Sequence, residues 1–193
     1  MLFRSVEGRG SFYTDADGQV VHVETTYGST SLNYDLNRAQ PNTTYVVRPD
    51  VNDPIEGFDY THVFETDELG RVTSASTENL SLGDAYRSPS VQSRVGNEGG
   101  VDYDGGHLLA NQFGGGGESG NLVPMLREVN QSGAGSFYEL ETRWRNLITG
   151  SDPAQVSVRI EPVYDGVSTV PTEIVVDWTL DGVPQPQRVF QNL

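Results

Sequence analysis

The strongest helical signal in the chain lies at residues 136–148, and the sequence after it changes to the period of a β-strand. Ser136 and Glu139 form a capping box, which predicts the first turn of a helix. Apolar residues then recur at helical spacing in a single stripe of Phe137, Leu140, Trp144, Leu147 and Ile148. Gly150 and Pro153 end the segment. A helix with one apolar face has to bury that face against another element, and the rest of the chain predicts a sheet.

Alternating apolar and polar residues predict half-buried strands in the remaining sequence. The alternation is clearest at residues 156–160 and 174–180, and Asp181-Gly182 is a strong turn signal. Residues 11–25 and 63–77 share the pattern F-x-T-D-x-x-G-x-V, whose Asp and Gly suit the tight turn of a hairpin. We therefore predict an α+β fold in which an antiparallel sheet packs against one main helix.

The chain divides at a proline-containing connector. Residues 36–57 hold three prolines, with room for one strand at residues 44–48. We expect a β-rich N-terminal extension at residues 1–57 and a main domain at residues 58–193, a size that suits one domain with a small appendage. The run GGGGESG at residues 114–120 predicts a flexible loop, because it lacks the glycine spacing of a dinucleotide or P-loop site.

Composition excludes several classes of site. The chain has no cysteine, which excludes disulfides, thiol nucleophiles and Cys-ligated zinc. All 12 basic residues are arginine, so a Schiff-base lysine is excluded as well. The net charge of −15 argues against a general nucleic-acid coat and leaves room only for a local site. No apolar run is long enough for a membrane span, and the first residues show no secretory signal peptide.

His107 is the candidate for acid–base chemistry. It follows two glycines, Gly105 and Gly106, which let backbone approach a ligand or a neighbouring strand closely. An imidazole has an ordinary pKa near 6.5, so His107 could act as a general base at neutral pH. The alternative is a turn histidine that hydrogen-bonds backbone.

Two oxygen-bearing side chains further along are candidates for a cation site. Asn130 lies eleven residues before Glu141, which would put both on one face of a continuous helix. Amide and carboxylate oxygens suit a hard cation such as Mg²⁺. Gly133 and Gly135 make that continuity doubtful, and an isolated asparagine is commonly a turn or cap residue.

These motifs together resemble one known family. Their order along the chain is DGGHL from Asp104, QFGG from Gln112, NLVPM from Asn121, then Asn130 and a Glu-bearing helix. This order resembles the DNA/RNA non-specific endonucleases, which are ββα-metal (His-Me) finger nucleases, and in particular their bacterial toxin-domain branch. The resemblance covers roughly residues 60–193 and implies a metal finger in the main domain.

The resemblance implies a role for each matching residue. His107 matches the general base that activates water, and Asn130 matches the ligand of a single Mg²⁺, with Mn²⁺ as the alternative metal. Glu141 matches the helix carboxylate that holds a metal-bound water. Asn121 matches an asparagine that shapes the site, and Asp104 matches the acid that opens the histidine motif.

One position departs from the family pattern. Many relatives carry an arginine where this chain has Gly105. Another arginine would then have to contact the scissile phosphate, since guanidinium groups bind phosphate bidentately. Arg87 is the first candidate, followed by Arg94 and Arg127.

The leading interpretation is a Mg²⁺-dependent endonuclease that hydrolyses DNA and possibly RNA, with little sequence preference. The resemblance further implies a domain that is secreted or delivered into target cells, with a cognate immunity protein as its partner. The alternative is a catalytically inactive, β-rich acidic module that binds a basic protein. The absent arginine at position 105 and the acidic composition favour that alternative.

Overall fold

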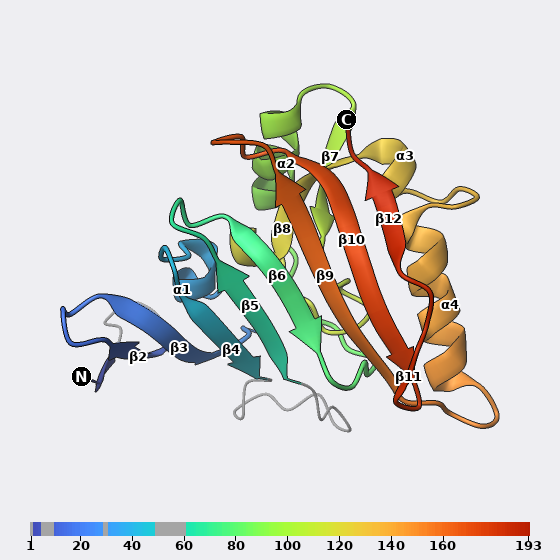
Figure 1. Cartoon of the computed structure of the whole chain (residues 1–193), viewed down its shortest axis with the longest axis horizontal. Helices are drawn as coiled ribbons and strands as arrows, with labels where there is room; N and C mark the ends of the chain where they lie inside the picture. Colours follow the sequence, from blue (N-terminus) through green and yellow to red (C-terminus); the bar gives the residue numbers. More distant parts are fainter. Residues whose placement is uncertain (1, 5–9, 29–30, 49–60) are drawn as a thin grey trace.

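A ten-stranded sheet forms the body of the molecule in the computed structural model, which describes residues 2–4, 10–28, 31–48 and 61–193 (Figure 1). Its strands are β1 (Leu2–Arg4), β2 (Ser11–Thr14), β3 (Val20–Thr26), β4 (Thr44–Arg48), β5 (His62–Thr66), β6 (Val72–Thr77), β9 (Val156–Tyr164), β10 (Pro171–Leu180), β11 (Val183–Pro184) and β12 (Arg188–Gln191). They follow the order β1-β2-β3-β4-β5-β6-β9-β10-β11, and β12 pairs with β10. Every pairing is antiparallel except that of β3 with β4.

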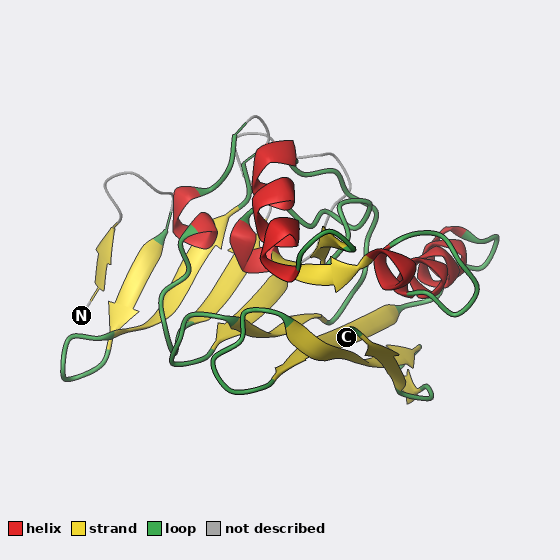
Figure 2. Cartoon of the chain, turned by 90° about the horizontal axis from the view of Figure 1, so that it is seen from above, coloured by secondary structure: helices red, strands yellow, loops and turns green. Residues whose placement is uncertain are grey.

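The helices and a separate two-stranded hairpin cover one face of this sheet (Figure 2). The helices are α1 (Tyr34–Asn37), α2 (Pro89–Gly99), the 3₁₀ turn η1 (Ser119–Asn121), α3 (Arg127–Asn130) and α4 (Phe137–Thr149). The hairpin consists of β7 (Tyr103–His107) and β8 (Leu122–Leu126). This arrangement is the predicted α+β fold with its finger.

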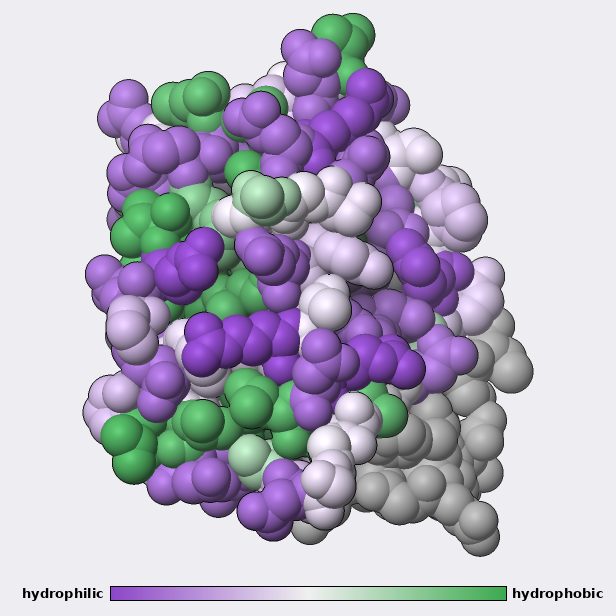
Figure 3. Space-filling view, turned by 90° about the vertical axis from the view of Figure 1, so that its right-hand side faces the viewer, coloured by the Kyte–Doolittle hydropathy of each residue, from purple (hydrophilic) through white to green (hydrophobic). Residues whose placement is uncertain are grey.

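The surface beside α4 is mostly hydrophilic, with smaller apolar patches between polar side chains (Figure 3). Among the described residues, no helix combines the length and the apolar character that a membrane span requires.

The predicted main helix is confirmed as α4. Ser136 is its N-cap and accepts from the Glu139 amide at 3.1 Å, while the Glu139 carboxylate accepts from the Gly135 amide. Its apolar stripe is buried around Trp144, whose ring lies 6.1 Å from those of Phe137 and Trp178. The helix therefore packs against the sheet through aromatic edge-to-face contacts.

The two predicted hairpins are also confirmed, and their turns have the same geometry. Gly18 and Gly70 both take a positive φ, at 83° and 77°. In each turn the aspartate, Asp15 or Asp67, accepts from two backbone amides through Oδ1. The shared sequence pattern thus specifies a shared turn.

The expected division at residues 57 and 58 lies outside the described residues. The strand expected before it is confirmed as β4, with the predicted bounds. β4 pairs with β5 in the same sheet, so the strands on either side of the expected boundary share one sheet.

Two local expectations are wrong. The first hundred residues contain helix α2, where only strands and turns were expected; Ser88 caps it, Pro89 starts it, and Val91 and Val95 form its short buried stripe. The glycine run at residues 114–117 is buried rather than a loose loop. A Cβ at Gly115 would lie 1.8 Å from the Leu109 carbonyl oxygen, so close packing requires glycine there.

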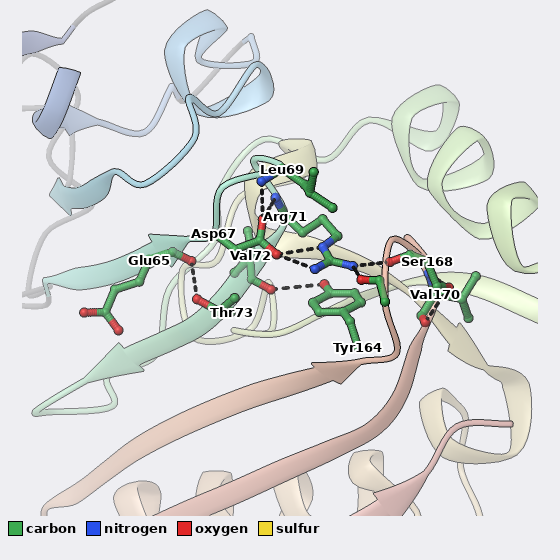
Figure 4. Close-up of polar contacts among 10 residues, drawn as sticks. Glu65, Asp67, Leu69, Arg71, Val72, Thr73, Tyr164, Ser168 and Val170 are labelled. Carbon is green, nitrogen blue, oxygen red and sulfur yellow. Dashed lines mark hydrogen bonds and ion pairs between the residues drawn. The ribbon is translucent and has the colours of Figure 1, made fainter. Parts of the chain in front are cut away.

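Arg71 links the β5–β6 turn to the β9–β10 turn at one end of the sheet (Figure 4). Its guanidinium bonds the Asp67 carboxylate at 2.6 and 2.7 Å and donates to the carbonyls of Gly166 and Ser168. It also lies 4.5 Å from the centre of the Tyr164 ring. The pair is largely buried, with 16% and 18% of the two side chains exposed. The turn of β5–β6 is thereby fixed to the turn of β9–β10.

We expect Arg71→Met to lower the free energy of unfolding by about 2–3 kcal/mol, because it leaves Oδ2 of the largely buried Asp67 carboxylate and two carbonyls without the guanidinium donor. Urea denaturation at pH 7 measures this. The matched control is Arg159→Met. Arg159 also contacts two carboxylates, those of Glu65 and Glu161, but nearly half of it is exposed. Its loss should cost less than about 1 kcal/mol. Equal losses in both variants would contradict the role given to Arg71.

Candidate active site

Hairpin β7–β8 and helices α3 and α4 bring three of the predicted residues to one cleft of about 450 Å³. His107 ends β7, where it pairs with Leu122 of β8. Asn130 ends α3, and Glu141 lies in the second turn of α4. The polar side chains around this cleft include Arg87, Gln92, His107, Asn130, Tyr138 and Glu141. The doubt about a continuous helix is resolved, since α3 and α4 are separate elements whose ends meet at the cleft.

His107 lines the cleft, and one of its two ring nitrogens is buried. Its Nε2 is buried and has no hydrogen-bond partner among the described residues. Burial, together with the positive charge of Arg87, lowers the pKa of His107 to about 4. The ring is therefore neutral at pH 7, and a neutral ring nitrogen can accept a proton.

Asp104 fixes the orientation of the Asn130 amide. Its carboxylate accepts from Asn130 Nδ2 at 3.1 Å, from Gln131 Nε2 at 2.8 Å and from Arg127 Nε at 3.3 Å. Burial raises the pKa of Asp104, but these three bonds outweigh it and the net pKa is lowered. An ionised carboxylate only accepts, so the Asn130 nitrogen has to face it. The Asn130 oxygen is left for another partner.

Glu141 is a buried carboxylate without a compensating partner. Only 8% of the residue is exposed, and burial raises the pKa of Glu141 to about 8. It makes no hydrogen bond or ion pair within the described part of the chain. Such a group is expensive to keep charged unless a cation lies beside it.

The cleft fits a hard cation that keeps much of its water. Asn130 and Glu141 offer an amide oxygen and a carboxylate to the same space. Within residues 2–4, 10–28, 31–48 and 61–193, no group of three His, Cys, Asp or Glu side chains could hold a metal ion by itself. Mg²⁺ usually keeps several of its waters. A site with few protein oxygens and open positions for water therefore suits it better than a site that encloses the metal in protein ligands.

Asn121 does not line the cleft. Its side chain accepts from the Leu109 amide at 2.9 Å and donates to the carbonyls of Leu109 and Gly116. These bonds use both of its amide protons, and the residue is fully buried. Asn121 thus ties the chain that follows His107 to the start of β8.

Residues of the N-terminal part of the chain hydrogen-bond the segment just before Asn121. Asn33, the N-cap of α1, donates its amide to Glu118 Oε1 at 2.8 Å. Asn37 accepts from Ser119 through both its side chain and its carbonyl. The 3₁₀ turn that carries Asn121 is therefore held by residues of the extension.

The three arginine candidates lie in different places. Arg87, which precedes α2, lines the cleft with His107 and bonds only loosely to Gln92, at 3.4 Å. Arg127 lies in an adjoining groove beside Asp104. Arg94 pairs with Glu98 and faces another crevice, so it does not meet His107.

Sequence reasoning missed several residues of the cleft, among them Asp84, Asn111, Gln92 and Tyr138. Gln92 lies on α2, which was not expected to be a helix, and its only sequence signal was the Ser88-Pro89 start. Tyr138 follows Phe137 on α4, where it is 46% exposed and points away from the apolar stripe.

Comparison with known proteins gives a consistent result. The family described as DNA/RNA non-specific endonuclease matches residues 49–182. The Type VII secretion system protein EssD of Staphylococcus aureus strain USA300 is 33% identical over 134 residues, which cover 68% of this chain and 22% of EssD. The chain thus spans about a fifth of the length of that relative.

Solved structures share the fold. The match to NucA from Streptococcus agalactiae with magnesium bound has a TM-score of 0.51 and 14% identity, and covers 75% of this chain and 77% of NucA. The match to an extracellular endonuclease has a TM-score of 0.53 and 20% identity, and covers 73% and 82% of the two chains.

We expect Glu118→Gln to remove a pH-dependent loss of stability. Burial raises the pKa of Glu118 from 4.5 to about 7, against hydrogen bonds from backbone amides. The folded state therefore holds this proton more tightly than the unfolded state, and the stabilisation present below pH 4.5 is lost as the pH rises through 7. Relative to wild type, Glu118→Gln should gain about 3 kcal/mol between pH 4.5 and pH 8 in urea denaturation.

The control for this measurement is Glu68→Gln, which removes an exposed carboxylate from a turn. Its stability relative to wild type should be nearly the same at both pH values. A Glu118→Gln difference that is also flat with pH would show that Glu118 is ionised at no cost in the folded protein.

Proposed function

The chain belongs to the DNA/RNA non-specific endonuclease family, and from that premise we propose that this nuclease is Mg²⁺-dependent, with His107 as its general base and Asn130 as its metal ligand. The observation that carries the proposal is the meeting of three residues in one cleft: the neutral His107 imidazole, Asn130 with its nitrogen held by Asp104, and the uncompensated Glu141 carboxylate. DNA is the proposed substrate, and RNA is a second one.

His107 takes the proton of the attacking water in this proposal. Its neutral ring lines the cleft, and general-base catalysis needs an acceptor within hydrogen-bond reach of the nucleophile. The low pKa keeps the base unprotonated before substrate arrives. A bound phosphate brings negative charge beside the ring, which raises its affinity for the proton when it has to accept one.

Asn130 would hold the metal directly and Glu141 would hold it through a bound water, while Asp104 and Asn121 act as positioning residues. Bound there, Mg²⁺ supplies positive charge for the phosphate and for the leaving oxygen. Asp104 aims the Asn130 oxygen by holding its nitrogen, and Asn121 holds the chain next to His107. Arg87, which also lines the cleft, contacts the phosphate in the role left open by Gly105. Contacts of this kind engage phosphate and do not read bases, which fits non-specific cleavage.

We expect His107→Ala to lower the rate of plasmid cleavage with Mg²⁺ by about 10²–10⁴-fold, because the general base is lost. EDTA should abolish cleavage by the wild-type chain. Asn130→Ala should act through the metal instead, by raising the Mg²⁺ concentration needed for half-maximal rate. Agarose gels and a fluorogenic oligonucleotide provide the rates.

Asp104→Asn separates positioning from ligation in the same assay. It removes the charged acceptor that fixes the Asn130 amide, so it should raise the Mg²⁺ requirement by about 10–100-fold without abolishing cleavage at saturating metal. Asp152→Asn, which removes an exposed carboxylate from the loop after α4, is the control. Full activity in His107→Ala would overturn the base assignment, and absence of cleavage by wild type with Mg²⁺ or Mn²⁺ would favour the acidic binding module.

We further propose that the domain is secreted or delivered as a toxin and is neutralised by a cognate immunity protein in its producer. The similarity to a protein of a secretion system supports delivery. Induced expression in a bacterial cytoplasm should arrest growth within a few generations, and His107→Ala should restore growth at equal protein level. Viable count and DNA integrity on gels are the readouts. Normal growth with intact DNA would contradict the toxin proposal.

A further inference from the structure

A second groove of about 420 Å³ adjoins the proposed catalytic cleft. The two hollows share Arg87, Gln92, Gly105 and Asn130, and the second extends along α2 to Ser93 and Asn97. Arg127 lies on the side opposite α2. The cleft that holds His107 is therefore one end of a longer depression.

The two hollows meet where backbone packs on backbone. A Cβ at Gly105 would lie 2.2 Å from the Gln92 carbonyl oxygen, and a Cβ at Gly96 would lie 2.7 Å from the Gly105 amide nitrogen. Helix α2 thus rests directly on β7, and no side chain from position 105 separates the hollows. A ligand that fills the cleft can continue into the groove.

The groove is less acidic than the molecule as a whole. The chain carries a net charge of −15, yet the groove contains two guanidinium groups and one carboxylate, that of Asp104. Asp104 already accepts three hydrogen bonds. The remaining charge in the groove is positive, which suits an anion.

Arg127 has donors to spare for such an anion. It contacts Asp104 through Nε alone, and 54% of its side chain is exposed. Its two terminal nitrogens make no contact within the described part of the chain. Across the groove, Ser93 and Asn97 are exposed and lie one turn apart on α2, where they add neutral hydrogen-bonding groups. A phosphodiester with its sugar matches this combination of a guanidinium fork and neutral polar groups.

We propose that this groove binds the nucleotide next to the cleaved phosphate, with Arg127 holding the phosphate of that nucleotide. The inference rests on the proposed function, because it takes the cleft as the place of cleavage. It makes the substrate a strand that runs from the cleft over Gly105 into the groove. Arg87, which borders both hollows, lies between the two phosphates.

The experiment measures binding separately from cleavage. A fluorescent single-stranded 12-mer is titrated with Mg²⁺ present in the His107→Ala background, and its anisotropy is followed at several salt concentrations. Adding Arg127→Gln should raise the Kd about ten-fold and lower the slope of log Kd against log salt by about 0.7, the value for one phosphate contact on a single strand. Arg94→Gln removes the same charge from the far side of α2 and should change the Kd by less than about two-fold.

A second variant tests the groove without disturbing the bond between Arg127 and Asp104. Ser93→Glu places a carboxylate in the groove and should weaken binding about as much as Arg127→Gln. Asn146→Glu adds the same charge on an exposed position of α4 that does not line the groove, and is the matched control.

The outcomes separate the two proposals. Binding of the 12-mer that is no weaker in Arg127→Gln and Ser93→Glu than in their controls overturns the groove, even if the wild-type chain cleaves DNA. Selective loss of binding in both variants supports the groove, even if the wild-type chain cleaves nothing. Absence of any binding of the 12-mer overturns the groove as well.

Discussion

The contact of α2 with β7 is the constraint on which the site depends. Gly96 and Gly105 let the two backbones meet without an intervening side chain, and this close approach determines what can surround His107. An arginine at position 105 would have to enter the space that Gln92 occupies. The packing of α2 on β7 therefore leaves no room for an arginine side chain at position 105. Guanidinium groups come instead from Arg87, before α2, and from Arg127, at the start of α3.

Hydrogen bonds of asparagine residues connect the surroundings of His107 to the rest of the molecule. Asn121 hydrogen-bonds the segment after His107, and the turn that contains Asn121 is held in place by hydrogen bonds to Asn33 and Asn37. The family match begins at residue 49, so both anchors lie outside it. Because an unmade hydrogen bond to a buried polar group is costly, these contacts specify one position for the loop. Helix α1 and its N-cap thus act as part of the support of the cleft.

Local signals in the sequence were sufficient for the elements that depend on local chemistry. The capping box of α4 and the Asp-x-x-Gly turns of the two hairpins satisfy their own backbone groups, so their positions could be predicted. Helix α2 is different. Its buried stripe is limited to Val91 and Val95, its glycines disfavour helix, and it is stabilised by packing on β7 and β8.

The same distinction applies to the glycine run and to the site. Composition does not tell a flexible glycine segment from a close-packed one, because the difference lies in distant atoms such as the Leu109 carbonyl. The order of motifs along the chain was enough to select His107, Asn130 and Glu141 as candidates. The hold of Asp104 on the Asn130 nitrogen and the groove beside Arg127 both require α3 and α2 in place, so no sequence pattern could reveal them.

Electrostatics explains how so acidic a chain can have a site for a polyanion. The net charge of −15 repels nucleic acid at long range, so attraction has to come from groups within about 10 Å of the phosphates, where screening by salt is incomplete. Several arginines are already committed to the fold: Arg71 to Asp67 and two carbonyls, Arg159 to two carboxylates, and Arg143 to the face of Trp178. Arg87 and Arg127 keep free donors, and both border the depression that contains His107. The guanidinium groups with free donors thus lie where the phosphate chemistry is proposed, and binding that depends on so few charges engages phosphates without reading the bases between them.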